Sequence, residues 1–314
     1  NHAVFKGLLF LGAGAVAHGT GTREMDHLGG LAKRMPVTGG AFLVGAAAIS
    51  GLPPLNGFVS EFLILLGGFQ GVVTTGPGAA VPALAAVTGL ALIGGLAAAC
   101  FAKAFGIVFL GEPRSDHAAH AHDVGLRMKV SMVVLSAMCL GIGLVGPWAV
   151  DATSPVVERM AGGAMVRPLA GPILWKVTAV STGLLALILA LVALRSRLLA
   201  RRTVGETVTW DCGYAAPTAR MQYTSSSFAQ PLTSLFAPFL RPRTHAVAPA
   251  GHFPRDAEFA SEVADVCRER IFRPSFQFVA AALHRLRWLQ HGRVHLYVLY
   301  IAVTLLVLLV WKLS

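Results

Sequence analysis

The chain has 314 residues, of which 55% are hydrophobic and only 13% are charged. Because soluble domains carry about 25% charged residues, this composition excludes an ordinary soluble protein and indicates one that crosses a membrane several times. The formal net charge of +11 does not indicate a nucleic-acid partner, since membrane proteins collect Lys and Arg in their cytoplasmic loops.

Six apolar segments predict an all-α transmembrane helix bundle with about six membrane crossings, one of them a broken helix. The segments cover residues 1–17, 37–75, 80–110, 129–150, 171–194 and 294–313. The connections after the first, third and fifth segments are rich in Lys and Arg, whereas the second and fourth are poorer in positive charge. Under the positive-inside rule, the first segment therefore runs from outside to inside. Trp148 and Trp175 fall at the predicted outer boundary, where aromatic side chains anchor helices.

The second apolar segment is too long for one straight crossing. Residues 37–75 would form a helix of about 58 Å at ~1.5 Å per residue, nearly twice a hydrocarbon core of about 30 Å. The predicted break is Gly51-Leu52-Pro53-Pro54, because Pro53 and Pro54 lack amide donors and disfavour helical angles in the preceding residue. We predict half-helices over 37–50 and 55–73. Unwound backbone inside a membrane must be covered by protein or line a water-filled cavity, as at the ion sites of transporters.

Charged side chains within apolar segments are costly, and we predict that two lie near the middle of the membrane. His2 and Lys6 share a helix face at i, i+4 spacing, and Lys6 lies about 16–17 Å before the end of its segment. Glu61, the one ionisable residue of 37–75, lies about 18 Å from the outer end of its half-helix. Either both carry protons, or Lys6 is held by a buried carboxylate and Glu61 by a lysine. Lys103 lies about 10–11 Å from its helix end, so it either joins the path or reaches the interface.

Other reactive residue types give no indication of a metal or cofactor site. The four cysteines form no CxxC pair and are interpreted as structural thiols. Metal-ligand residue types gather in one predicted cytoplasmic loop, which is interpreted as a solvated segment. They are Asp116, His117, His120, His122 and Asp123. We expect no metal, no cofactor and no bond chemistry in the chain itself.

The region between the fifth and sixth crossings is predicted to lie on the cytoplasmic surface of the membrane. It contains an apolar piece with two prolines at 228–240, a charged helix candidate at 256–270 and a mixed segment at 276–290. The last of these combines aromatic and aliphatic side chains with His and Arg, as an interfacial helix does. Packing and docking to a partner are its expected roles.

Three motifs resemble a known family. NHAVFKGLLFLGAGAV, MDHLGGLAKRMP and GLPPLNGFVSEFLIL occur in this order. They are similar to the second half of the antiporter-like proton-translocating subunits shared by respiratory complex I, multi-subunit sodium/proton antiporters and membrane-bound [NiFe] hydrogenases. The resemblance covers residues 1–114. It implies that His2 and Lys6 belong to a central hydrophilic axis and that Glu61 ends the proton channel, as in the branch with Glu at this position.

Two further motifs narrow the resemblance. FAKAFGIVFLGEPR and TWDCGYAAPTARMQYTSSSFAQPL resemble the large antiporter-like subunits of formate hydrogenlyase and hydrogenase-4 complexes. The resemblance implies that a first antiporter repeat would precede Asn1, so the sequence is expected to be a C-terminal fragment without a complete proton path.

These features predict a proton-translocating membrane subunit of a hydrogenase-type complex in the inner (plasma) membrane of a bacterium. Lys6 is the expected central carrier, His2 its relay, Glu61 the exit group, and Pro53-Pro54 the break that admits water. The expected partners are other membrane and peripheral subunits and the lipid bilayer. The alternatives are a sodium/proton antiporter or complex I subunit, or a non-pumping membrane anchor. The predicted divisions are the antiporter-like part at 1–114, additional transmembrane helices at 115–202, the interfacial region at 203–293 and a last transmembrane helix at 294–314.

Overall fold

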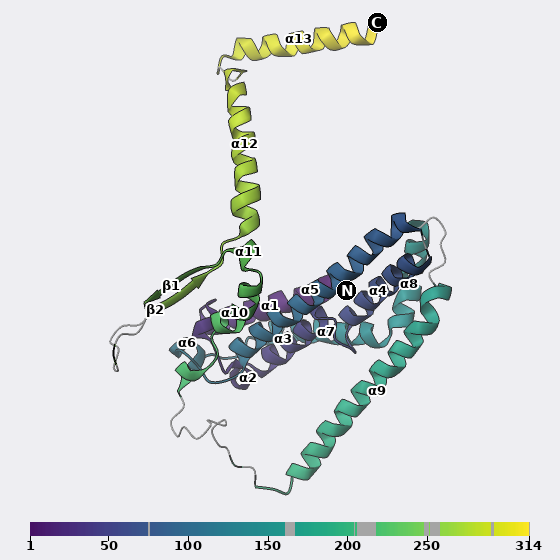
Figure 1. The fold of residues 1–314 in the computed structure, drawn as a ribbon, viewed down its shortest axis with the longest axis vertical. Coiled ribbons are helices and arrows are strands. Elements are labelled where there is room, and N and C mark those ends of the chain that lie inside the picture. The colour runs from purple at the N-terminus through teal and green to yellow at the C-terminus, as the bar shows by residue number, and fades with distance from the viewer. Residues whose placement is uncertain are drawn as a thin grey trace. The chain divides into compact units, whose positions relative to one another are not determined.

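Helices make up most of the structure, a computed structural model that describes residues 1–74, 76–160, 167–203, 205, 218–247, 251, 258–289 and 292–313. Within these residues, six helices are long and apolar enough to cross a membrane, which confirms the predicted polytopic helical membrane protein. The chain divides into two compact units, residues 1–228 and 229–314. Figure 1 shows the elements by which each unit is described below.

The first unit is a bundle of long helices with two short ones between them. Its helices are α1 (His2–Thr20), α2 (Leu31–Arg34), α3 (Pro36–Ile49), α4 (Asn56–Thr74), α5 (Pro77–Phe109), α6 (Asp116–Ala119), α7 (Leu126–Leu144), α8 (Gly146–Met160) and α9 (Arg167–Leu199), and the start of α10 (Ser225–Leu235). The crossing expected over 129–150 ends early at α7, because Pro147 at the start of α8 lacks the amide that would continue its hydrogen-bond ladder. The rings of Trp148 and Trp175 meet edge to face at 4.8 Å.

The second unit combines two long helices and a short one with a hairpin. Its elements after α10 are α11 (Ala237–Leu240), β1 (Arg243–Val247), β2 (Glu258–Glu262), α12 (Arg273–His284) and α13 (Val294–Leu313). β1 and β2 pair antiparallel, with Arg243 opposite Glu262. The helix predicted over 256–270 is therefore wrong for β2, since pairing with the preceding strand β1 satisfies the backbone of this segment. Over the segment predicted at 276–290, the described residues form α12 and a following 3-10 turn, Arg285–Leu289.

The broken helix is confirmed, with α3 and α4 as its two halves. α5 packs along both of them, in the opposite direction (Figure 1). Near one end of α5, the ring of Phe109 lies 5.3 Å from the ring of Phe42 on α3. Farther along, Gly94 lies beside Glu61 of α4. A single helix of 33 residues, about 50 Å long at ~1.5 Å per residue, therefore follows both halves.

The break lies where the local backbone chemistry predicts it. α3 ends at Ile49, and Gly51 adopts a left-handed φ of 64°, which glycine accepts at no steric cost. Gly57 of α4 packs directly on the Ala48 carbonyl, and Gly143 of α7 packs on the Pro54 carbonyl. Neighbouring backbone thus covers one side of the unwound segment, as a break inside a membrane requires.

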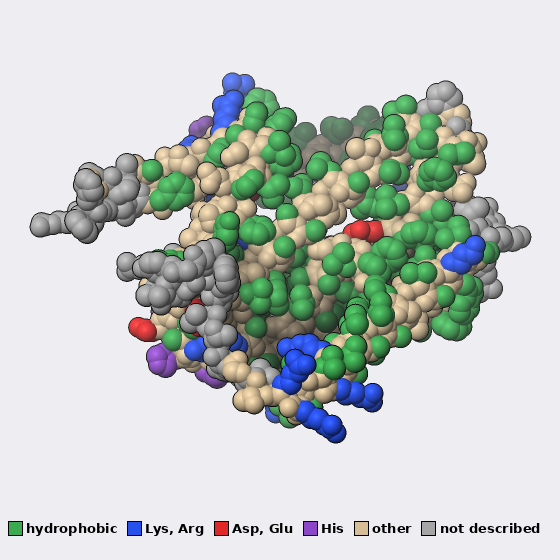
Figure 2. Space-filling view, turned by 60° about the horizontal axis from the view of Figure 1, so that its bottom comes forward, with side chains coloured by type: hydrophobic (Ala, Val, Ile, Leu, Met, Phe, Trp, Pro, Cys, Tyr) green, Lys and Arg blue, Asp and Glu red, His purple; other side chains and the backbone are tan. Residues whose placement is uncertain are grey.

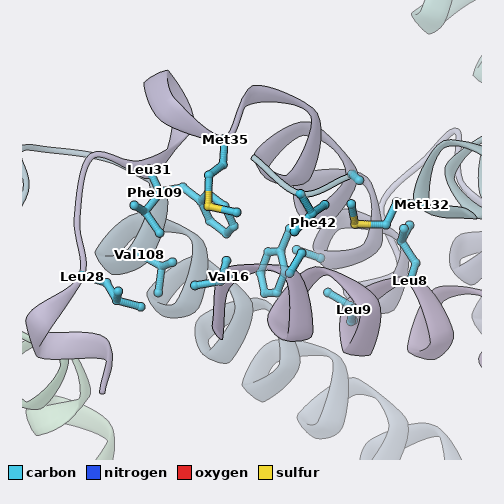
Figure 3. Close-up of a cluster of buried hydrophobic side chains, with 14 of the residues drawn as sticks. Leu8, Leu9, Val16, Leu28, Leu31, Met35, Phe42, Val108, Phe109 and Met132 are labelled. Atoms are coloured by element: carbon cyan, nitrogen blue, oxygen red, sulfur yellow. The ribbon is translucent and has the colours of Figure 1, made fainter. Parts of the chain in front are cut away.

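An apolar core holds α1, α3, α5 and α7 together. Phe109, Leu8, Leu31, Met35 and Met132 are among its largest fully buried side chains. Figure 3 shows them interleaved with Leu9, Phe42 and Val108. Because lipid is as apolar as these side chains, close van der Waals packing holds such helices together in a membrane. This core fixes α1 against the broken helix.

Candidate functional site

Glu61 points from α4 into the helix break. Its carboxylate contacts Gly51, and a methyl group at Gly51 would collide with it. On the other side, a Cβ at Gly94 of α5 would lie 3.9 Å from Oε2 of Glu61. Side chains of a helix lean toward its N-terminus, which brings this carboxylate back to the break. Glu61 is half-buried, and none of the described residues donates a hydrogen bond to it or forms an ion pair with it.

His2 and Lys6 lie on the face of α1 that points away from the apolar core. His2 is exposed and Lys6 half-buried, and Phe10, one turn further on, is 72% exposed. The Lys6 ammonium lies 5.4 Å from the centre of the Phe10 ring, a cation–π contact. The His2 ring meets the Phe5 ring edge to face at 5.1 Å. The predicted shared face is present, but the structure shows no direct contact between Lys6 and Glu61.

A cluster of uncharged polar groups joins α1 to α4 between these charged residues. Asn1 Nδ2 donates to the Asn56 carbonyl at 3.2 Å and to Ser60 Oγ, and Asn56 Nδ2 donates to the Asn1 carbonyl at 3.4 Å. Asn56 is completely buried. Lys6 is five residues from Asn1, and Glu61 is five residues from Asn56, each about 7.5 Å along its helix. The sequence motifs did not single out this cluster, because Asn1 lies more than 50 residues from Asn56 and Ser60.

Lys103 does not join Glu61. It lies nine residues beyond Gly94 on α5, about 13.5 Å along the helix at ~1.5 Å per residue, and it forms no ion pair with Glu61. It is half-buried. The structure thus separates Lys103 from the charged group at the break.

The loop with metal-ligand residue types is folded onto the bundle, so its interpretation as a solvated segment is wrong for Asp123. The carboxylate of Asp123 accepts hydrogen bonds from the Val37 amide at 3.1 Å and from Thr38 Oγ1 at 2.6 Å, and Lys129 Nζ lies 3.8 Å away. The first amides of a helix lack internal partners and favour a negative charge, so Asp123 caps α3. Among the described residues, no group of three or more His, Cys, Asp or Glu side chains could hold a metal ion.

Residues 222–225, in the motif that follows α9, pack against the loops after α1 and α5 in the first unit. Arg114 donates to the Tyr223 carbonyl at 2.8 Å, and the Gln222 side chain bonds the backbone of Glu112 at 2.9 and 3.1 Å. Asp26 accepts from the Ser225 amide at 2.7 Å. These bonds fasten the chain after α9 to the loops that follow α1 and α5. Residues 209–217 of the same motif lie outside the described residues.

The distribution of hydrophobic and basic side chains on the surface agrees with a membrane location. In Figure 2, hydrophobic side chains cover the shafts of the helices and the visible Lys and Arg side chains gather toward their ends. An apolar cavity of about 590 Å³ opens between α1, α3 and α5, lined by Phe10, Ala13, Phe42 and Val108 among others. Arg23 lines this cavity, whereas Lys6 and Glu61 do not.

The comparisons with known proteins indicate an antiporter-like membrane subunit. Residues 1–84 match the family described as NADH:quinone oxidoreductase/Mrp antiporter, TM. This match confirms the resemblance of the first motifs to that family.

Two curated relatives extend the similarity beyond this domain. The chain is 35% identical to Hydrogenase-4 component B of Escherichia coli (strain K12) over 99% of its own length and 48% of that protein. It is 37% identical to Formate hydrogenlyase subunit 3 of the same strain, over 77% of this chain and 39% of that one. The chain therefore spans less than half the length of these relatives.

A solved structure shares the fold. A chain of the membrane-bound sulfane sulfur reductase, an archaeal respiratory membrane complex, superposes with a TM-score of 0.61 over 98% of this chain and 46% of that one. At 21% sequence identity, this likeness shows the fold alone.

Proposed function

We propose that this chain forms part of a proton-translocating membrane subunit of a hydrogenase or formate hydrogenlyase type complex, in the inner (plasma) membrane of a bacterium. The observation that carries the proposal is the Glu61 carboxylate at the Gly51 break, with no fixed partner among the described residues. Ionisable residues within a membrane are expensive and mark ion or proton pathways. Similarity to Hydrogenase-4 component B and Formate hydrogenlyase subunit 3 supports the type of complex.

Each residue of the site has a defined task in this proposal. Lys6 holds a proton on α1, and His2 on the same face exchanges it, since imidazole side chains serve as proton shuttles. Glu61 receives the proton at the break and passes it outward. The Gly51 to Pro54 segment leaves the backbone unwound, so that water can enter between the half-helices. Redox chemistry in partner subunits would supply the energy.

The test uses Glu61→Gln in the full-length subunit within its assembled complex. Gln keeps the shape of the side chain but cannot carry a proton at the break. We expect proton uptake into inverted membrane vesicles to fall at least tenfold while the amount of assembled complex stays unchanged. Glu112→Gln is the matched control, since Glu112 lies exposed in a loop and pairs only with exposed Lys33 at 3.8 Å. Unchanged uptake in Glu61→Gln would overturn the proposal.

The same vesicles separate the remaining functions. Uptake that requires sodium would support a sodium/proton antiporter subunit instead. Full redox activity and assembly without any proton uptake in the wild type would support a membrane anchor.

For the second unit, we propose that α12 lies on the membrane surface. Four apolar residues at spacings of four, three and four form one stripe, and each is about half-exposed or more. They are Phe272, Phe276, Val279 and Leu283. Residues 268–293 carry six Arg against one Glu, a balance that attracts anionic lipid headgroups. α13 begins at Val294, five residues after the 3-10 turn ends at Leu289, so the end of α12 must lie near a membrane boundary.

A further inference from the structure

Asn56 has a buried oxygen without a partner in the described part of the chain. The residue is completely buried, and no donor lies within hydrogen-bond distance of its Oδ1. Its Nδ2 faces two acceptors, the carbonyl and the Oδ1 of Asn1, both at 3.4 Å. Turning the amide over would set an oxygen against these two oxygens. The orientation of the amide is therefore fixed, and Oδ1 must point away from Asn1.

The neighbouring groups are already paired with each other. The Asn56 carbonyl accepts from Asn1 Nδ2 at 3.2 Å and from Ser60 Oγ at 3.4 Å. Asn1 Nδ2 also donates to Ser60 Oγ. The cluster thus leaves one strong acceptor unused, at the first residue of α4 after the break.

A buried polar atom of this kind needs an explanation. An amide oxygen that loses water without gaining a donor destabilises the fold, and nearly all such atoms in proteins are paired with protein or ordered water. A leucine of similar size would fill the same space without this cost. A bound water molecule would satisfy this oxygen by donating a hydrogen bond to it. The cluster lies between the helices that carry Lys6 and Glu61.

We propose that Asn56 is a positioning residue of the proton path, whose Oδ1 holds a water molecule at the start of α4 on the path from Lys6 to Glu61. This inference rests on the proposed function. A proton that leaves the Lys6 ammonium is accepted by water, passes along hydrogen bonds, and is accepted by the Glu61 carboxylate.

Three variants in the assembled complex test this role. Asn56→Leu removes the acceptor and should lower proton uptake into vesicles at least tenfold. Asn56→Asp keeps an oxygen acceptor while losing the Nδ2 donor, and should restore at least a third of wild-type uptake. Asn1→Ala removes the tether to α4 but leaves Asn56 in place. It should lower the temperature of unfolding while keeping more than half of the uptake.

A structural measurement separates this inference from the proposed function. A cryo-EM map at a resolution that shows water should contain a water molecule within about 3 Å of Asn56 Oδ1 in the wild type, and none in Asn56→Leu. Absence of this water in the wild type would overturn the role of Asn56. Equal loss of uptake in Asn1→Ala and Asn56→Leu, without recovery in Asn56→Asp, would also overturn it. Neither result would contradict the proposed role of Glu61. Full uptake in Glu61→Gln would overturn the proposed function whatever the map shows. If Asn56→Leu fails to assemble, the role of Asn56 is tested by the presence of the water in the wild-type map and by the proton uptake of Asn56→Asp.

Discussion

Gly51→Ala is expected to disable the Glu61 site without any change in the ionisable groups. Gly51 has a φ of 64°, and a residue with a Cβ in this left-handed region costs about 1–2 kcal/mol. The new methyl group would also occupy the space of the Glu61 carboxylate. The carboxylate must therefore move, and a displacement of about 1 Å at a reacting group can cost on the order of 100-fold in rate. We expect proton uptake to fall at least about tenfold.

Gly94→Ala is the matched control for this prediction, because Gly94 faces the same carboxylate from α5. Its added Cβ would lie 3.9 Å from Glu61 Oε2, an ordinary van der Waals distance, so uptake should stay near wild type. Proton uptake into inverted vesicles and the unfolding temperature of the purified complex would be measured for both variants. Equal uptake in Gly51→Ala and Gly94→Ala would refute the argument that the break positions Glu61.

Two further predictions concern the ends of the helices. Asp123→Ala should destabilise the protein by about 1–2 kcal/mol, because the Val37 amide loses its cap; Lys129→Ala should cost less than about 1 kcal/mol, since its pair with Asp123 is partly exposed. Thermal unfolding in detergent measures both, and an equal or larger loss in Lys129→Ala would contradict the capping role. A fluorophore on Val279→Cys of α12 should be quenched by lipids with labelled acyl chains, whereas one on Gln277→Cys should be quenched by aqueous iodide. The same quenching at both positions would rule out a helix lying on the membrane surface.

Local chemistry in the sequence predicted much of the first unit. Hydropathy alone predicted six crossings, because each must match the thickness of the bilayer. The break could be placed between Gly51 and Pro54 because glycine tolerates left-handed angles and proline lacks an amide donor. The shared face of His2 and Lys6 follows from the helical repeat. The roles of these residues and of Lys103, and the predicted domain divisions, remain predictions.

The tertiary structure decided what depends on contacts between distant residues. Asp123 was misread as solvated because the Val37 amide that it caps lies 86 residues earlier in the chain. The Glu258–Glu262 strand was misread as helix because its partner strand supplies hydrogen bonds that its own sequence does not reveal. Asn56 and Asn1 meet across 55 residues, so their cluster has no local signal. The sequence by itself determined the crossings, the break and the charges, since these follow from local backbone chemistry and the lipid solvent. Only the fold brought the Glu61 carboxylate to Gly51 and buried the oxygen of Asn56, because the packing of α1, α4, α5 and α7 creates both environments.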